Sequence, residues 1–102
     1  MELIPGVELI ETSGHVPGHQ VVLIRLPQTG PILLAIDAAA MEIDFDPETR
    51  LEDNGVDLDP AGAHVSVRKL FELAKREGVT LTVFGHDECQ WPTLKKAPEF
   101  YD

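Results

Sequence analysis

Residues 20–26 read QVVLIRL, residues 27–30 read PQTG and residues 31–36 read PILLAI, and together they decide the fold. The two outer runs are apolar and rich in β-branched residues, which is typical of strands. The four residues between them place Pro and Gly where a hairpin loop requires them. The stretch therefore predicts an antiparallel hairpin in which Leu26 pairs with Pro31.

The remaining elements are predicted outward from this hairpin. Residues 7–11 (VELIE) form a further short apolar run. A helix begins with Asp59 as N-cap and Pro60 in its first position, and Gly78 ends it. Residues 80–84 (TLTVF) then predict a last strand. The expected architecture is α/β in the order β-β-β-α-β, and the helix buries one apolar face made of Ala63, Val67, Leu70, Phe71 and Ala74.

One segment, residues 41–59, carries no clear periodicity. It is acidic and rich in turn residues, and its length indicates a functional or covering loop. Its part 53–59 (DNGVDLD) lacks the spacing of a calcium-binding loop, so we expect a solvated loop there.

Length, charge and cysteine content exclude several classes of protein. The chain has 102 residues, enough for one small domain, and 8 Lys and Arg against 18 Asp and Glu give a net charge of -10. That charge disfavours nucleic acid and anionic membranes as partners. The single cysteine, Cys89, excludes an internal disulfide. No run is long and apolar enough to span a bilayer, and the opening residues do not resemble a signal peptide, so we expect a cytoplasmic protein.

Three side chains that commonly bind metals are expected at one edge of the sheet. Counting outward from the hairpin loop brings Gln20 opposite Asp37 and His19 opposite Ala38. A strand-helix-strand crossover is normally parallel, so His86, after the last strand, should lie beside Asp37. Two His and one Asp suit zinc, with room left for a water molecule. The alternative is that these polar residues only cap strand ends.

The sequences of three motifs resemble those of a known protein family. Residues 13–20 (SGHVPGHQ), residues 36–38 (IDA) and residues 84–87 (FGHD), in this order, resemble the C-terminal half of metallo-β-lactamase-fold hydrolases. The similarity is strongest to the N-acyl homoserine lactonase-like branch, which also has an ending similar to residues 90–101. The resemblance spans nearly the whole chain.

The resemblance implies roles for individual residues. In this family the second His of the GHxPGH segment binds one metal, the Asp bridges two metals and the His of the GHD segment binds the other, which implies metal ligation by His19, Asp37 and His86. Asp37 would also be the catalytic residue, because it holds the metal pair together. His15 would shape the loop. The implied activity is a metal-dependent hydrolase of the lactonase or esterase kind, which uses zinc or a similar divalent ion and a metal-bound hydroxide on a small ester or lactone.

The family also has features that this chain lacks. An HxHxDH motif, which supplies four further ligands in the family, is absent, and Ile36 and Ala40 stand where the lactonase branch usually has Gly and Tyr. We therefore expect residues 1–102 to form a single truncated domain, half of the family's αββα sandwich, whose uncovered sheet face is completed by self-association into a dimer or larger even-numbered homo-oligomer. Two alternatives stay open: a non-catalytic fragment with an incomplete metal site, and a half-domain completed by a separate N-terminal half.

Overall fold

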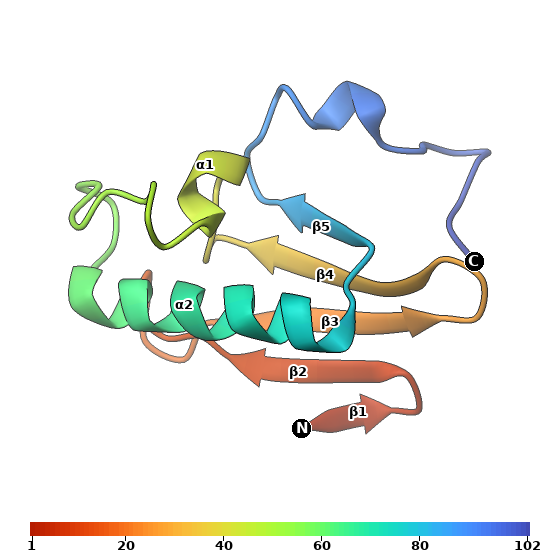
Figure 1. The fold of residues 1–102 in the computed structure, drawn as a ribbon, viewed down its shortest axis with the longest axis horizontal. Helices are drawn as coiled ribbons and strands as arrows, with labels where there is room; N and C mark the ends of the chain where they lie inside the picture. The colour runs from red at the N-terminus through yellow and green to blue at the C-terminus, as the bar shows by residue number, and fades with distance from the viewer.

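The predicted hairpin lies in the middle of a five-stranded sheet in the computed structural model, which describes residues 1–102. The strands follow the chain order across the sheet (Figure 1). Neighbouring strands are antiparallel except the last pair, which is parallel as the crossover predicts. The strands are β1 (Glu2–Ile4), β2 (Val7–Glu11), β3 (Gln20–Leu26), β4 (Gly30–Ile36) and β5 (Leu81–Phe84).

The long helix α2 (Pro60–Glu77) begins and ends as the sequence predicts. The side chain of Asp59 accepts a hydrogen bond from the backbone N–H of Gly62, and Pro60 occupies the first turn. Gly78 follows the helix in the left-handed conformation, with φ 65°. Its backbone N–H donates to the helix carbonyls, which ends the helix without exposing them unpaired.

The hairpin register differs by one residue from the prediction. Leu26 pairs with Gly30 rather than with Pro31, because Gly30 adopts a φ of 87° and thereby joins the strand itself. Val22 accordingly pairs with Leu34. If this observed register continues to the end of the hairpin, His19 lies opposite Asp37. The predicted register placed Gln20 opposite Asp37, so the observed register brings His19 and Asp37 closer together.

Two short elements were not predicted. The strand β1 has three exposed residues, too few for any periodicity, and pairs with β2 across the Pro5–Gly6 turn. The helix α1 (Glu42–Phe45) interrupts the acidic segment that was predicted to be a loop. Near the end of the chain lies a short 3-10 helix, η1 (Trp91–Thr93).

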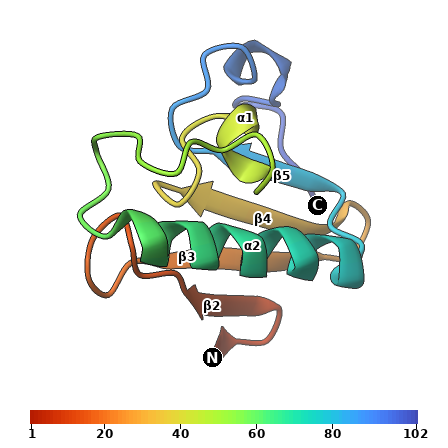
Figure 2. The same ribbon diagram turned by 60° about the vertical axis from the view of Figure 1, so that its left-hand side comes forward.

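Both α-helices lie on one face of the sheet, as the views in Figures 1 and 2 agree. The core forms beneath α2, where seven buried side chains gather: Ile10, Val21, Leu23, Leu33, Ala38, Leu70 and Leu73. Phe45 of α1 extends this packing through edge contacts with Phe71 and Phe84. No helix is long and apolar enough to cross a membrane.

No helix covers the opposite face of the sheet in either view. Val22, Ile24 and Leu34 alternate with core residues and lie on this face, where they are half-buried. The strands of the hairpin are therefore apolar on both faces, and the α-helices cover only one of these faces.

The candidate site residues lie at one end of the sheet, which is here called the rim and consists of residues 12–19, 36–40 and 84–87. At this end β2, β4 and β5 finish and β3 begins (Figure 1). The rim is therefore formed by loops that are far apart in sequence and are held together by strand pairing.

Candidate metal centre

Two of the three predicted ligands are in direct contact at the rim. His86 Nε2 lies 3.0 Å from Asp37 Oδ1, a hydrogen bond between the loops that follow β5 and β4. Backbone bonds from the N–H of Gly85 to the carbonyl of Ala39 and from the N–H of His86 to that of Ala40 join the same loops. The predicted convergence of Asp37 and His86 at the carboxyl ends of parallel strands is confirmed.

The backbone before Asp37 is in an unusual conformation. Ile36 has a φ of 52°, in the left-handed region that a β-branched residue rarely enters. Gly85 lies against it so closely that a Cβ at this position would be 2.2 Å from the carbonyl oxygen of Ile36. The direction in which Asp37 leaves β4 is therefore set by a strained residue and a glycine that fits against it.

His19, the third predicted ligand, is fixed from the other side of the rim. Its Nδ1 forms a hydrogen bond of 2.8 Å with the hydroxyl of Thr12, which also lies 3.3 Å from the backbone carbonyl oxygen of His19. The remaining nitrogen, Nε2, is buried and has no hydrogen-bond partner.

The electrostatics keep this ring neutral. Burial lowers the pKa of His19 below its ordinary value, the nearby carboxylate of Asp37 opposes that change and His15 adds to it. A neutral imidazole with an unpartnered nitrogen is the form in which histidine binds a metal ion.

His15, in the same loop as His19, belongs to a charged network that the sequence did not predict. Its Nδ1 lies 3.0 Å from Asp57 Oδ1, and Asp57 Oδ2 lies 2.9 Å from a guanidinium nitrogen of Arg50. The other side of the ring, Nε2, faces Asp37 Oδ2 at 3.9 Å. Arg50 also donates to the backbone carbonyls of Ala38 and Asp44, so it connects the network to the loop after β4.

Residues 53–59 were expected to form a solvated loop, but this expectation is wrong for Asp57. The side chain of Asp57 is only 4% exposed, because the partners of its carboxylate, Arg50 and His15, enclose it. A signal for this existed in the sequence: Arg50 is the only basic residue among the acidic residues 41–59. The role expected for His15 in shaping its loop agrees with the bond from the N–H of Leu58 to its carbonyl.

A metal ion is a chemical fit for these residues, although they are not arranged around one point. No group of three or more His, Cys, Asp or Glu side chains is placed so that it could hold an ion. The buried Nε2 of His19 nevertheless has no hydrogen-bond partner, and the Asp37 carboxylate is close enough to act on the pKa of His19. Imidazole and carboxylate donors suit zinc and similar divalent ions. Ligation by His19, Asp37 and His86 stays a prediction.

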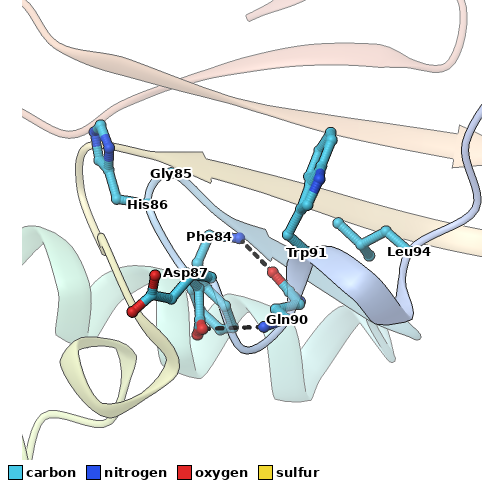
Figure 3. Close-up of a pocket in the computed structure, with 8 residues that line it drawn as sticks. Phe84, Gly85, His86, Asp87, Gln90, Trp91 and Leu94 are labelled. Carbon is cyan, nitrogen blue, oxygen red and sulfur yellow. Dashed lines mark hydrogen bonds between the residues drawn. The ribbon is translucent and has the colours of Figure 1, made fainter.

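Two hollows open at this end of the molecule. The first has a volume of about 330 Å³, and its lining includes His15, Asp37, Ala40 and His86. The second, of about 340 Å³, also has His86 in its lining, which combines the apolar residues Phe84, Trp91 and Leu94 with polar ones such as Asp87 and Gln90 (Figure 3). Figure 3 also shows the side chain of Gln90 bonded to the backbone N–H of Phe84, which holds this segment against β5.

Comparisons with known proteins show which proteins this chain resembles. No family model matches the chain. The N-acyl homoserine lactonase AttM of Azorhizobium caulinodans is 47% identical over 91 residues, which are 89% of this chain and 33% of that protein. The lactonase AiiA of Bacillus thuringiensis subsp. kurstaki is 37% identical over 99 residues, 97% of this chain and 38% of that protein.

Solved structures give the same result. An N-acyl homoserine lactone hydrolase with the product N-hexanoyl-L-homoserine bound at its catalytic metal centre superposes with a TM-score of 0.89 and 37% identity over 99% of this chain and 38% of that one. AidC, a dizinc quorum-quenching lactonase, shares the fold with a TM-score of 0.67 and 19% identity over all of this chain and 37% of that one.

The five-stranded sheet and its single helical layer thus match part of the metallo-β-lactamase fold. Within this fold the chain has the sequence and structure of part of an N-acyl homoserine lactonase-like protein. It spans 33% to 38% of the length of the curated relatives described above.

Proposed function

We propose that this chain forms part of a metal-dependent lactonase, to which it contributes His19, Asp37 and His86 as ligands of divalent metal, preferably zinc. The observation that carries the proposal is the buried, unpartnered Nε2 of His19 beside the Asp37 carboxylate, which itself contacts His86. The similarity to N-acyl homoserine lactonases supports the same activity.

Asp37 and His19 have distinct roles in this proposal. The chemistry that a divalent metal supplies here, when bound, is a more acidic water molecule and a polarised carbonyl group. Asp37 offers one oxygen on the side of His86 and the other on the side of His15, so its carboxylate is placed to join two halves of a site. His19 adds a ring nitrogen, Nε2, and the hydrogen bond from Nδ1 to the Thr12 side chain holds the ring in place.

The hollow lined by Trp91 and Leu94 supports a substrate with an apolar part. It adjoins His86, and Figure 3 shows the side chains of His86 and Trp91 on the same side of the segment that carries them. A small lactone with an apolar substituent would place its ring near Asp37 and its substituent against Trp91. N-acyl homoserine lactones have this composition.

Metal binding is the direct test of the proposal. Zinc bound per chain, measured by elemental analysis after dialysis, should be at most about one ion, held weakly because water must fill the positions that these residues leave open. His86→Ala and Asp37→Ala should remove it, whereas His64→Ala, on helix α2 beside a different hollow, should not. Equal metal content in wild type and His86→Ala would exclude His86 from the site.

Hydrolysis of activated esters and lactones is the second measurement. We expect low activity with broad specificity, lost on chelation and in Asp37→Ala, because no other carboxylate contacts His86 at the rim. Activity that survived Asp37→Ala would assign the chemistry to another site. Metal binding without activity would favour the alternative, a folded but non-catalytic part of a lactonase, and activity gained on adding a separate N-terminal half would favour a half-domain completed in trans.

We also propose that a second copy of the chain covers the open face of the sheet. Val22, Ile24 and Leu34 leave an apolar surface there that no helix covers, and water disfavours such a surface. The copy is proposed as partner because the curated relatives contain much additional chain that is not present here. Light scattering should give the mass of a dimer or a larger even-numbered oligomer at micromolar concentration, and a monomer mass would contradict this.

A further inference from the structure

The segment that carries His86 is closed on itself by the side chain of Gln90. Its Oε1 accepts a hydrogen bond of 3.0 Å from the backbone N–H of Phe84, and its Nε2 donates to the carbonyl oxygen of Thr82 over 2.6 Å (Figure 3). Both groups lie on the outer edge of β5, the last strand of the sheet. The amide of Gln90 thus takes the place of a neighbouring strand, and residues 84–90 form a loop whose start and end are fixed.

Asp87 ties the middle of this loop to another part of the molecule. Its Oδ1 accepts hydrogen bonds from the backbone N–H groups of Cys89 and Gln90, at 3.0 and 3.1 Å, which closes a turn. Its Oδ2 accepts a hydrogen bond of 3.0 Å from the N–H of Glu42, the first residue of α1. The carboxylate therefore uses one oxygen within its own turn and the other between two loops.

The bond from Glu42 is the last of three that join the loop after β4 to the loop after β5. The N–H of Gly85 donates to the carbonyl of Ala39, and the N–H of His86 donates to that of Ala40, at 3.3 and 2.8 Å. Backbone pairing ends there, because an N–H in the first turn of a helix has no partner within the helix. The carboxylate supplies that partner, so His86 is attached on both sides to the loop that also carries Asp37.

The ring of His86 is exposed, so its direction depends on the backbone that carries it. Its side chain is 73% exposed, and one hydrogen bond, to Asp37 Oδ1, holds the ring. Exposed side chains change rotamer within nanoseconds. Figure 3 shows the side chains of His86 and Asp87 on opposite sides of the segment, so Asp87 acts on the ring through the backbone and not by contact.

We propose that Asp87 is a positioning residue for His86, and that the bond between its Oδ2 and the N–H of Glu42 holds the His86 segment where its ring reaches Asp37. Closing the turn would require Oδ1 alone, so the second oxygen is the part of Asp87 that a turn does not explain. The inference rests on the proposed function for the role of His86 as a metal ligand. The attachment of the segment can be measured without metal.

Two substitutions remove the same bond from opposite ends. In Asp87→Asn the single amide oxygen can serve the two N–H groups of the turn, and the NH₂ group then meets the N–H of Glu42. Glu42→Pro removes that N–H at the first helical position, where proline is tolerated. Met41 already has the extended conformation that a residue before proline requires, with φ -136° and ψ 163°. Glu42→Ala keeps the N–H and is the matched control.

Zinc affinity, measured by competition with a chromophoric chelator, gives the magnitude. Asp87→Asn and Glu42→Pro should each weaken binding by about 10- to 100-fold, as is typical when groups that orient metal ligands are lost. The double variant should lose no more than the weaker of the two, because both changes remove one bond. Glu42→Ala should leave the affinity unchanged, and so should Asp46→Asn, which removes a carboxylate charge at the other end of α1.

Hydrogen exchange of the backbone amides, followed by NMR in the metal-free chain, gives a readout that does not depend on zinc. In Asp87→Asn and Glu42→Pro the amides of Gly85 and His86 should lose protection, whereas those of β3 should keep it. If Asp87 served only its turn, Glu42→Pro would leave Gly85 and His86 as protected as in wild type.

The outcomes separate this inference from the proposed function. If the wild-type chain binds zinc and both variants bind it equally well, Asp87 only closes its own turn, and the inference is overturned while the proposed function stands. If the wild-type chain binds no zinc, the proposed function fails, and hydrogen exchange alone decides whether Asp87 holds the His86 segment. If Asp87→Asn does not fold, Glu42→Pro, which leaves the His86 segment unaltered, decides the question.

Discussion

The core beneath α2 and the rim at the end of the sheet are built in different ways. The core is made of aliphatic side chains that are almost completely buried, and its main contributors, Leu23, Leu33 and Leu70, have no exposed surface. The rim is held by hydrogen bonds, a buried ion pair and glycines in close contact. The difference indicates that stability comes mainly from the core, whereas the rim uses specific polar geometry to place acceptors in one hollow.

The comparison also explains why the rim contains strain. Ile36, the last residue of β4, is the one non-glycine residue of the chain that keeps a left-handed conformation. A residue in this region is held there by its surroundings, and such residues are concentrated at functional sites. The buried Nε2 of His19, which has no hydrogen-bond partner, is a second unfavourable feature at the same place. Both are what we expect where a ligand completes the structure.

The largest expected effect is in the core. Leu70→Ala should reduce the free energy of unfolding by about 2 to 5 kcal/mol, because it removes a fully buried side chain of α2 and leaves a cavity. Val65→Ala, on the same helix but 68% exposed, should change it by less than about 0.5 kcal/mol. Urea denaturation followed by circular dichroism measures both. Similar losses in the two variants would mean that the helix does not pack as described.

At the rim, Gly85→Ala should destabilise the fold less than Leu70→Ala does, but it should weaken metal binding more. Gly85→Ala places a Cβ 2.2 Å from the Ile36 carbonyl, so the backbone that carries Asp37 and His86 must move apart. Zinc affinity should fall by about 10- to 100-fold, as is typical when the groups that orient metal ligands are disturbed.

Gly78→Ala is the matched control for this substitution. It introduces strain at a φ of 65° but meets no neighbour, and it lies at the far end of α2 from the rim. Its cost to stability is about 1 kcal/mol, and zinc affinity should be unchanged. Equal effects of the two alanines on zinc binding would show that the approach of Gly85 to Ile36 does not orient the rim.

The core and the rim also differ in how well the sequence predicts them. The helix was predicted from Asp59 to Gly78 because its cap, its first-turn proline and its apolar spacing are all local signals. The hairpin was predicted, but its register was wrong by one residue, since the loop sequence does not show that Gly30 joins the strand. Hairpin register depends on a single backbone conformation, which periodicity does not report.

The same limit applies to the candidate site. The contact of Asp37 with His86 follows from strand topology, which the sequence carries in its pattern of elements. The bond between His15 and Asp57 joins residues 42 positions apart through a loop without periodicity, so no local signal predicts it. Only the isolated Arg50 in an acidic segment indicated that this loop contains a buried partner.

The smallest expected effect concerns Glu11, which ends β2 and so lies where the core meets the rim. The backbone N–H of Ser13 donates to its carboxylate over 2.6 Å and Lys69 lies nearby. The bonds from Ser13 lower the pKa of Glu11 below the ordinary value of 4.5, burial opposes this slightly and Lys69 adds to it.

The pH dependence of Glu11 follows from the sign of this change. Because the unfolded chain binds the proton more tightly, the contribution of Glu11 to stability is present above pH 4.5 and is lost as the pH falls through its folded pKa. Glu11→Gln should therefore unfold at lower urea than wild type at neutral pH, and the difference should disappear in acid. Glu52→Gln, in the exposed loop before α2, is the control and should show no difference at either pH. If Glu11→Gln were less stable than wild type by the same amount at both pH values, the carboxylate charge at the end of β2 would not contribute to stability. The rim would then be joined to the core only through uncharged hydrogen bonds such as those of Thr12.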